Sequence, residues 1–267
     1  MPHDTYTHGH DESVLRSHTW RTAENSAAYL IPYLSRGDTL LDIGCGPGTI
    51  SNDFARIVAP GKVVGSDIAP EIVQRASDAP HPDNVTFEVA DAYDLQYPDN
   101  SFDVVHAHQL LQHLSDPVAA LKEMRRVLKP NGVVAVRDSD KAGFMSYPED
   151  PRLVEWIDVY LEITKRNGAQ AKAGRYLLHW IHQAGFTNAE LTTSNWVFAD
   201  AETRQWWGGL WADRIDHSSI SDQAVSYGIA TREQLKAYSQ AYREWSSAED
   251  SVFVVPHFEV IGRKSVS

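Results

Sequence analysis

The chain has 267 residues, of which 42% are hydrophobic and 22% charged, a balance typical of a globular protein and not of a disordered one. Its formal net charge of -12 repels phosphate backbones, which argues against a nucleic-acid substrate. The single cysteine, Cys45, excludes a disulfide within the chain, and no run approaches the roughly 20 apolar residues that span a bilayer. The start MPHDTYTHGHDESV also lacks the apolar core of a secretory signal. We expect a cytoplasmic protein without a membrane span, whose oligomeric state the sequence does not reveal.

The first half of the chain alternates short apolar runs with amphipathic helical patterns. After a polar, histidine-rich stretch, the pattern predicts one amphipathic helix over residues 19–34. Strands are then expected at residues 38–46, 62–69, 84–92, within 101–114 and at 132–140, and helices at 49–59, 71–79 and 117–132. Such alternation is typical of right-handed βαβ units that build a parallel sheet.

The second half is less regular. Helices are predicted at residues 151–168 and 175–186, and strands at 189–199 and 251–264. Residues 200–250 or thereabouts read as a helical insertion between the last two strands. We therefore predict a single domain over 1–267, with N-terminal cover helices in 1–36, a ligand-binding core in 37–140 and a substrate-side half in 141–267.

A glycine-rich turn follows the first predicted strand. The segment LLDIGCGPGT puts Asp42 at the strand's end and Gly44, Gly46 and Gly48 in the turn before a helix. In doubly wound sheets, ligands bind outside the carboxyl ends of the strands, and glycines let the backbone approach them. The G-x-G-x-G spacing differs from the G-x-G-x-x-G of dinucleotide-binding folds, and Asp42 favours a cationic ligand group such as an ammonium. Taken alone, a glycine-rich turn also occurs for purely structural reasons.

Two more acidic residues follow the second and third predicted strands. Asp67 is placed to accept hydrogen bonds from both hydroxyls of a ribose, with Ile68 against an adenine face, unless it only caps the next helix. Asp91 is placed to accept from an adenine amino group, unless it only stabilises a turn. Because the carboxyl ends of parallel strands meet at one edge of the sheet, these carboxylates together predict a single nucleoside pocket.

Four segments in combination, LLDIGCGPGT, SDIAPEIV, VADAYDLQYPDNSFDVV and LKEMRRVLKPNGVVAV, resemble the class I S-adenosylmethionine-dependent methyltransferases. Within this class, the sequence pattern most resembles that of the quinone-biosynthesis C-methyltransferases and their small-molecule relatives. The resemblance implies an α/β fold, with a Rossmann-like, doubly wound, mostly parallel seven-stranded sheet, an antiparallel last strand and a helical substrate-covering insertion. It implies S-adenosyl-L-methionine as cofactor, S-adenosyl-L-homocysteine as product and a small-molecule methyl acceptor as partner. The implied cofactor-binding residues are Asp42, Gly44, Cys45, Gly46, Gly48, Asp67, Ile68, Asp91, Ala92, His108, Gln109 and Arg21.

The implied reaction is a direct displacement at the methyl carbon. The sulfonium is a good leaving group, so positioning is the main task and can supply roughly 7–11 kcal/mol of the barrier. A base is needed only when the acceptor must lose a proton. The candidate catalytic residues are His108, His113 and Tyr6, although a lone histidine more often only makes hydrogen bonds. Tyr6 belongs to an N-terminal segment that relatives fold over the cofactor, and an exposed tail is the alternative.

Aromatic residues concentrate in the second half and indicate where an apolar or aromatic acceptor binds. The expected substrate residues are Trp180, Trp206, Trp207, Trp211 and Arg175, with a buried core as the alternative. Asp138 and Asp140 follow the fifth strand, but no second carboxylate cluster accompanies them, so no metal is expected.

Three other functions fit parts of the sequence. A nicotinamide-dependent oxidoreductase agrees with Asp67 but not with the loop spacing or Asp91. The same fold and cofactor can serve a cyclisation or rearrangement, or a non-catalytic binding protein. The sequence does not decide whether the acceptor atom is carbon, nitrogen or oxygen.

Overall fold

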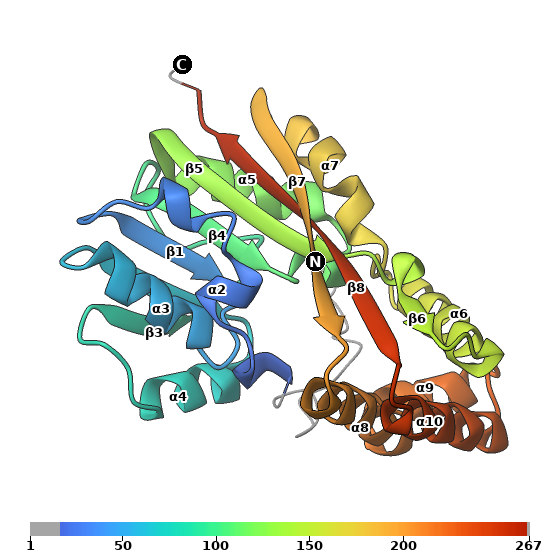
Figure 1. The fold of residues 1–267 in the computed structure, drawn as a ribbon. Coiled ribbons are helices and arrows are strands. Elements are labelled where there is room, and N and C mark those ends of the chain that lie inside the picture. Colours follow the sequence, from blue (N-terminus) through green and yellow to red (C-terminus); the bar gives the residue numbers. More distant parts are fainter. Residues whose placement is uncertain (1–16, 266–267) are drawn as a thin grey trace.

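A mixed β-sheet of eight strands runs through residues 17–265, the part of the chain that the computed structural model describes. The strands are β1 (Thr39–Ile43), β2 (Lys62–Asp67), β3 (Val85–Val89), β4 (Phe102–His108), β5 (Leu128–Ser139), β6 (Met145–Tyr147), β7 (Asn188–Phe198) and β8 (Val252–Arg263). Their order is β3-β2-β1-β4-β5-β8-β6, and β7 pairs with β8 (Figure 1). Strands β1 to β5 are parallel, whereas β8 is antiparallel to β5, β6 and β7. The predicted mostly parallel sheet with an antiparallel last strand is confirmed, and β6 is an eighth strand that the sequence pattern did not predict.

Helices cover both faces of the parallel strands because successive side chains of a strand point to opposite faces. Leu40 and Val104 pack in the core with α3, whereas Leu41 and Val105 pack in the core with α5 and α7. The helices of these layers are α2 (Ala23–Ser26), η1 (Ile31–Tyr33), α3 (Thr49–Val58), α4 (Pro70–Asp78), η2 (Leu111–His113), α5 (Pro117–Val127), η4 (Ala173–Tyr176) and α7 (Leu177–Gln183). The sheet therefore has a buried core on each face, as doubly wound folds do.

A third core, rich in aromatic residues, belongs to a helical layer at one end of β7 and β8 (Figure 1). The layer consists of α6 (Pro151–Arg166) before β7 and of α8 (Ala201–His217), α9 (Ser219–Ser226) and α10 (Arg232–Ser247) between β7 and β8. Trp156 of α6 and Trp211 of α8 meet edge to face, with ring centroids 6.3 Å apart. The predicted insertion is thus present, and its core also includes a helix from before β7. Within residues 17–265, none of the helices has the length and apolar character needed to cross a lipid bilayer.

Two helices differ in extent from the helices that the sequence predicts. The predicted helix over 19–34 is broken into α2 and η1, because Thr22 caps α2 and Ala27 leaves the helical conformation at φ -141°. The predicted helix over 117–132 ends at Val127, and the following residues belong to β5. Pro130 has no N–H to continue the helix, and the amide of Asn131 donates instead to Lys264 O at 2.9 Å.

Candidate functional site

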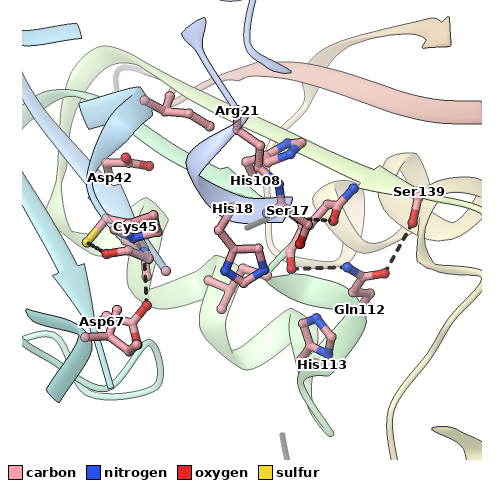
Figure 2. Close-up of a pocket in the computed structure, with 18 of the residues that line it drawn as sticks. Ser17, His18, Arg21, Asp42, Cys45, Asp67, His108, Gln112, His113 and Ser139 are labelled. Atoms are coloured by element: carbon pink, nitrogen blue, oxygen red, sulfur yellow. Dashed lines mark hydrogen bonds between the residues drawn. The ribbon is translucent and has the colours of Figure 1, made fainter. Parts of the chain in front are cut away.

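A cavity of about 590 Å³ lies at the carboxyl ends of the first strands and extends to the helical layer. Figure 2 shows Asp42, Cys45 and Asp67 on one side of it and Gln112 and Ser139 on the other. The predicted site residues that line it are Arg21, Asp42, Gly44, Cys45, Gly46, Asp67, Ile68, Asp91, Ala92, His108, Gln109, His113, Trp206, Trp207 and Trp211. Gly48, Arg175 and Trp180 are not among its lining residues, and Tyr6 lies outside the described residues.

The glycine turn after β1 is tied to the end of β2. The amides of Gly44 and Cys45 both donate to Ser66 O, at 2.7 and 2.9 Å, and the amide of Gly46 donates to Asp67 Oδ2 at 3.1 Å. Gly44 and Gly46 have φ of 71° and 55°, a left-handed conformation that glycine adopts without strain. The turn therefore presents backbone to the cavity at a fixed distance from the Asp67 carboxylate.

Gly48 has a different reason to be glycine. Its φ is 79°, and an added Cβ would lie 2.5 Å from carbons of the Phe87 ring. It lies at the N-terminus of α3, packed against β3. Close packing explains this glycine, which the sequence analysis had assigned to the cofactor.

Asp42 is buried at the end of β1 and faces α3. Its Oδ1 is 2.7 Å from His106 Nδ1, and its Oδ2 accepts from Ser51 Oγ at 2.5 Å. His106 is its register partner on β4, so both side chains point to the same face of the sheet. The carboxylate lines the cavity with its position fixed by two buried partners.

Two further acidic residues of the cavity follow β2 and β3. Asp67 Oδ1 accepts from the Ala69 amide at 3.1 Å, so Asp67 contacts both the turn and the start of α4. Ile68 has 57% of its side chain exposed although it lines the cavity, which leaves an apolar face open there. Asp91 Oδ1 accepts from the Tyr93 amide at 2.9 Å. These residues form an acidic end of the cavity with one apolar wall.

His108 lies at the end of β4, between the two ends of the cavity. It is buried, and neither ring nitrogen has a hydrogen-bond partner. Burial and the nearby Arg21 and Arg137 guanidinium groups hold the pKa of His108 well below its usual value, so the ring is neutral. A neutral imidazole offers the cavity one donor and one acceptor.

Gln109 follows His108 and holds two other residues together. Arg21 Nη2 donates to Gln109 Oε1 at 2.8 Å, and Gln109 Nε2 donates to His257 Nε2 at 2.8 Å. His257 Nδ1 faces Val255 O at 3.0 Å, which assigns the proton to Nδ1. Gln109 has φ of 53°, an uncommon conformation for a residue with a side chain, and such positions cluster at functional sites.

A buried lysine follows β5 on the far side of the cavity. Lys141 Nζ donates to Gln112 Oε1 at 2.8 Å and to Ser139 Oγ at 3.3 Å, and it lies 5.1 Å from the centre of the Tyr160 ring. Burial lowers the pKa of Lys141 to about 7, against the opposing effect of Asp138. Nearby His113 is half-buried, and burial together with Lys141 lowers its pKa to about 3.

Aromatic rings and an arginine close the helical end of the cavity. Trp206, Trp207 and Trp211 lie on α8 and Trp196 on β7. Arg214, one turn along α8, lies 5.0 Å from the centre of the Trp211 ring and donates to Ser17 Oγ at 3.1 Å. Trp207 and Trp211 belong to the buried aromatic core and also line the cavity, so the buried-core alternative is confirmed, and their contact with a substrate stays a prediction.

The remaining predicted residues have other contacts. Trp180 stacks on Tyr176, with centroids 5.6 Å apart, and packs on the α5 face of the sheet. Arg175 donates to the buried Asp140 carboxylate. Both were expected at the substrate, and the structure places both outside the cavity. The described residues contain no group of three or more His, Cys, Asp or Glu side chains that could hold a metal ion.

Several polar and aromatic lining residues were not predicted from the sequence, among them Gln112, Ser139, Lys141, Trp196 and Arg214. Two signals pointed to some of them: Ser139 and Lys141 stand at the carboxyl end of a parallel strand, and Arg214 is three residues after Trp211 on one helix face. Trp196 carried no such signal, because β7 reaches the cavity only through its pairing with β8.

Known proteins match this chain over most of its length. A family model described as a methyltransferase domain matches residues 34–185. An uncharacterised methyltransferase of Schizosaccharomyces pombe is 33% identical over 276 residues, covering 97% of this chain and 96% of that protein. The 27-O-demethylrifamycin SV methyltransferase of Amycolatopsis mediterranei is 34% identical over 233 residues, covering 83% and 81%. The solved structure of the YcgJ protein from Bacillus subtilis has the same fold, with a TM-score of 0.57 at 21% identity over 91% of this chain and all of that one. The chain therefore belongs to the methyltransferase domain family and is a class I S-adenosylmethionine-dependent methyltransferase.

Proposed function

We propose that this protein transfers the methyl group of S-adenosylmethionine to a small organic acceptor by direct displacement. The observation that carries the proposal is a single cavity that joins the acidic ends of β1 and β2 to the aromatic wall of α8. A donor at the acidic end and an acceptor at the aromatic end would then meet beside His108. The similarity to an enzyme named for rifamycin methylation supports a small-molecule acceptor.

The residues at the acidic end fit the parts of the donor. Asp67 would hold the ribose hydroxyls, and Ile68 and Ala92 would contact the adenine, with Asp91 at its amino group. Gly44, Cys45 and Gly46 would border the methionine part, where an added Cβ on Gly46 would meet only His18 Nδ1, at 3.7 Å. Asp42 would place a negative charge near the cationic groups of the donor. Arg21 would pair with the carboxylate of the donor's methionine part.

The chain's own contribution to the chemistry is alignment. When bound, S-adenosylmethionine supplies an electrophilic methyl group, and its sulfur leaves with the bonding electrons as a lone pair of the acceptor forms the new bond. Trp206, Trp207 and Trp211 line the acceptor end with aromatic surface, which would keep bulk water from a bound acceptor. The two unpartnered nitrogens of His108 would orient a polar group of the acceptor. Because its pKa is lowered, His108 is a weak base, and a hydrogen-bonding role suits it better than proton abstraction.

Thermal unfolding of the purified chain tests the donor assignment. S-adenosylhomocysteine should raise the midpoint, and NAD at the same concentration should leave it unchanged, since the spacing of the glycine turn and Asp91 do not suit a dinucleotide. Stabilisation by NAD alone would contradict the proposal. Transfer of label from methyl-labelled S-adenosylmethionine to a panel of small aromatic molecules then tests the reaction itself, and tight donor binding without turnover of any acceptor would favour a binding protein.

A further inference from the structure

The two ends of the cavity differ in the sign of their charged side chains. The lining carboxylates are Asp42, Asp67, Asp91 and Asp94, from the ends of the first three strands and the loop after β3. The lining lysine and arginines are Arg21, Lys141 and Arg214, from segments before β1, after β5 and on α8. At the aromatic end, the described residues contribute no carboxylate to the lining.

We call the end of the cavity lined by Arg21, Lys141 and Arg214 the basic end. Of these three residues, Lys141 has the contacts that say most about a ligand. Its side chain is 5% exposed, and its two hydrogen-bond acceptors, Gln112 Oε1 and Ser139 Oγ, are both neutral. An ammonium group has three donors, so one remains after these two bonds. Buried charged groups are normally paired with an opposite charge. Asp138 and Asp140 act electrostatically on Lys141, but neither is among the residues that line the cavity. Among the described residues, no carboxylate lines this end of the cavity, so the remaining donor of Lys141 is available to an anion of the ligand.

The surroundings of Lys141 limit what that anion can be. Tyr160 lies beneath the ammonium group, and Trp211 packs against Tyr160 with ring centroids 6.0 Å apart. Trp211 and Phe144 line the same part of the cavity. Aromatic rings thus lie beside Lys141 in the cavity, which suits a flat organic group with an anionic oxygen at its end.

On the basis of the proposed function, we infer that the acceptor is an aromatic or similarly flat molecule with an anionic oxygen, a carboxylate or an ionised phenol, which pairs with Lys141. The ammonium group would be a specificity determinant that orients the acceptor, while the methyl transfer occurs beside His108. The low pKa of Lys141 in the protein agrees with a site that gains stability when an anion arrives.

A matched pair of probes tests the carboxylate form of this inference. The probes are 1-naphthoate and 1-naphthamide, which have similar shape and differ in charge, titrated into the complex of the protein with S-adenosylhomocysteine. Naphthoate should bind about tenfold or more tightly than the amide, since hydrogen bonds to charged groups contribute about 1.5–3 kcal/mol. Lys141→Met should abolish that preference, Lys141→Arg should retain part of it, and Lys122→Met, on the exposed side of α5, should leave it unchanged.

A second probe distinguishes an ionised phenol from a carboxylate. Binding of 4-nitrophenol at slightly acidic pH should increase the visible absorbance of its ionised form in the wild-type complex, and Lys141→Met should remove the increase. A response to either probe that depends on Lys141 supports the inference and identifies the group. Equal binding of acid and amide without a nitrophenol signal, or a preference that persists in Lys141→Met, overturns it.

The design separates this inference from the proposed function. S-adenosylhomocysteine binding is measured first on every variant, and it also reports folding. Failure of the wild-type chain to bind S-adenosylhomocysteine would refute the donor assignment. Normal binding without an acid preference would refute only the role of Lys141. If Lys141→Met does not fold, the comparison of naphthoate with naphthamide on the wild-type complex still shows whether the site prefers an anion.

Discussion

The two ends of the cavity are held in place by different forces. At the sheet end, Asp67 and the glycine turn are fixed by backbone hydrogen bonds between neighbouring strands. At the helical end, Trp207 and Trp211 are fixed by packing among rings from α6, α8 and α10. Charge and backbone geometry thus build the proposed donor site, whereas side-chain volume builds the proposed acceptor site. Substitutions at the first end should mainly change binding, and those at the second should mainly change stability.

The largest expected effect concerns the helical end. Trp211 is 1% exposed and contacts Trp156, Tyr160 and Tyr242, so Trp211→Ala should lower the free energy of unfolding by about 3–5 kcal/mol. Trp206→Ala, at a partly buried ring on the same helix, should lower it by clearly less. Denaturant unfolding followed by fluorescence measures both. Equal losses of unfolding free energy in the two variants would show that Trp206 and Trp211 contribute alike to the core.

At the sheet end, Asp67→Ala should weaken S-adenosylhomocysteine binding by about a hundredfold, because two hydrogen bonds to a carboxylate would be lost at about 1.5 kcal/mol each. Calorimetric titration measures the affinity. Asp83→Ala provides the control, since this exposed aspartate precedes β3 and is not among the cavity's lining residues. Unchanged affinity in Asp67→Ala would refute the ribose assignment. A loss of stability in Asp67→Ala as large as that in Trp211→Ala would contradict the expected difference between the two ends of the cavity.

Gly48 is an exception within the sheet end, because packing requires it. Gly48→Ala should lower the free energy of unfolding by about 1–3 kcal/mol more than Gly168→Ala. Both glycines have positive φ, 79° and 76°, but an added Cβ meets Phe87 at Gly48 and nothing within 4 Å at Gly168. The difference between the two variants therefore isolates the steric overlap. Similar losses in thermal or denaturant unfolding would show that the Phe87 ring moves aside.

The smallest effect is expected at His257, a buried residue of β8 that is hydrogen-bonded to Gln109. Burial holds its pKa well below the usual 6.5, so below pH 6.5 the unfolded chain binds a proton that the folded chain does not. The free energy of unfolding should therefore fall as the pH falls, by up to about 1.4 kcal/mol per pH unit from this residue. The His257→Asn variant should show a shallower decrease between pH 6.5 and pH 5 in denaturant titrations. An identical slope would mean that His257 is protonated in the folded state.

The sequence predicted the sheet end far better than the helical end, for a physical reason. Strand ends and glycine turns are local patterns, so Asp42, Asp67 and Asp91 could be placed from spacing alone. The helical end combines α6 with α8–α10, which are distant in sequence, and the amphipathic pattern does not say which helices pack together. Trp180 and Trp211 are both tryptophans of the second half, yet Trp180 packs on the α5 face of the sheet and Trp211 in the core of the helical layer.

Lys141 was missed for a related reason. A lysine in a sequence is read as a solvated surface group, and only the approach of Tyr160 and Gln112 from other elements buries it. At Gly48, by contrast, a motif position was interpreted as a cofactor contact; packing against Phe87 gives a separate reason for glycine there, and the contact stays a prediction.

The β7–β8 hairpin brings both junctions of the helical insertion together, since Phe198 at the end of β7 is opposite Phe253 near the start of β8. A segment that leaves and re-enters the sheet at one point can change length or composition without altering any strand register. Such an arrangement separates changes in residues 199–251 from the glycine turn after β1, an inner strand of the sheet. Grafting the corresponding helices of a relative onto this hairpin would therefore test whether residues 199–251 determine the proposed acceptor preference.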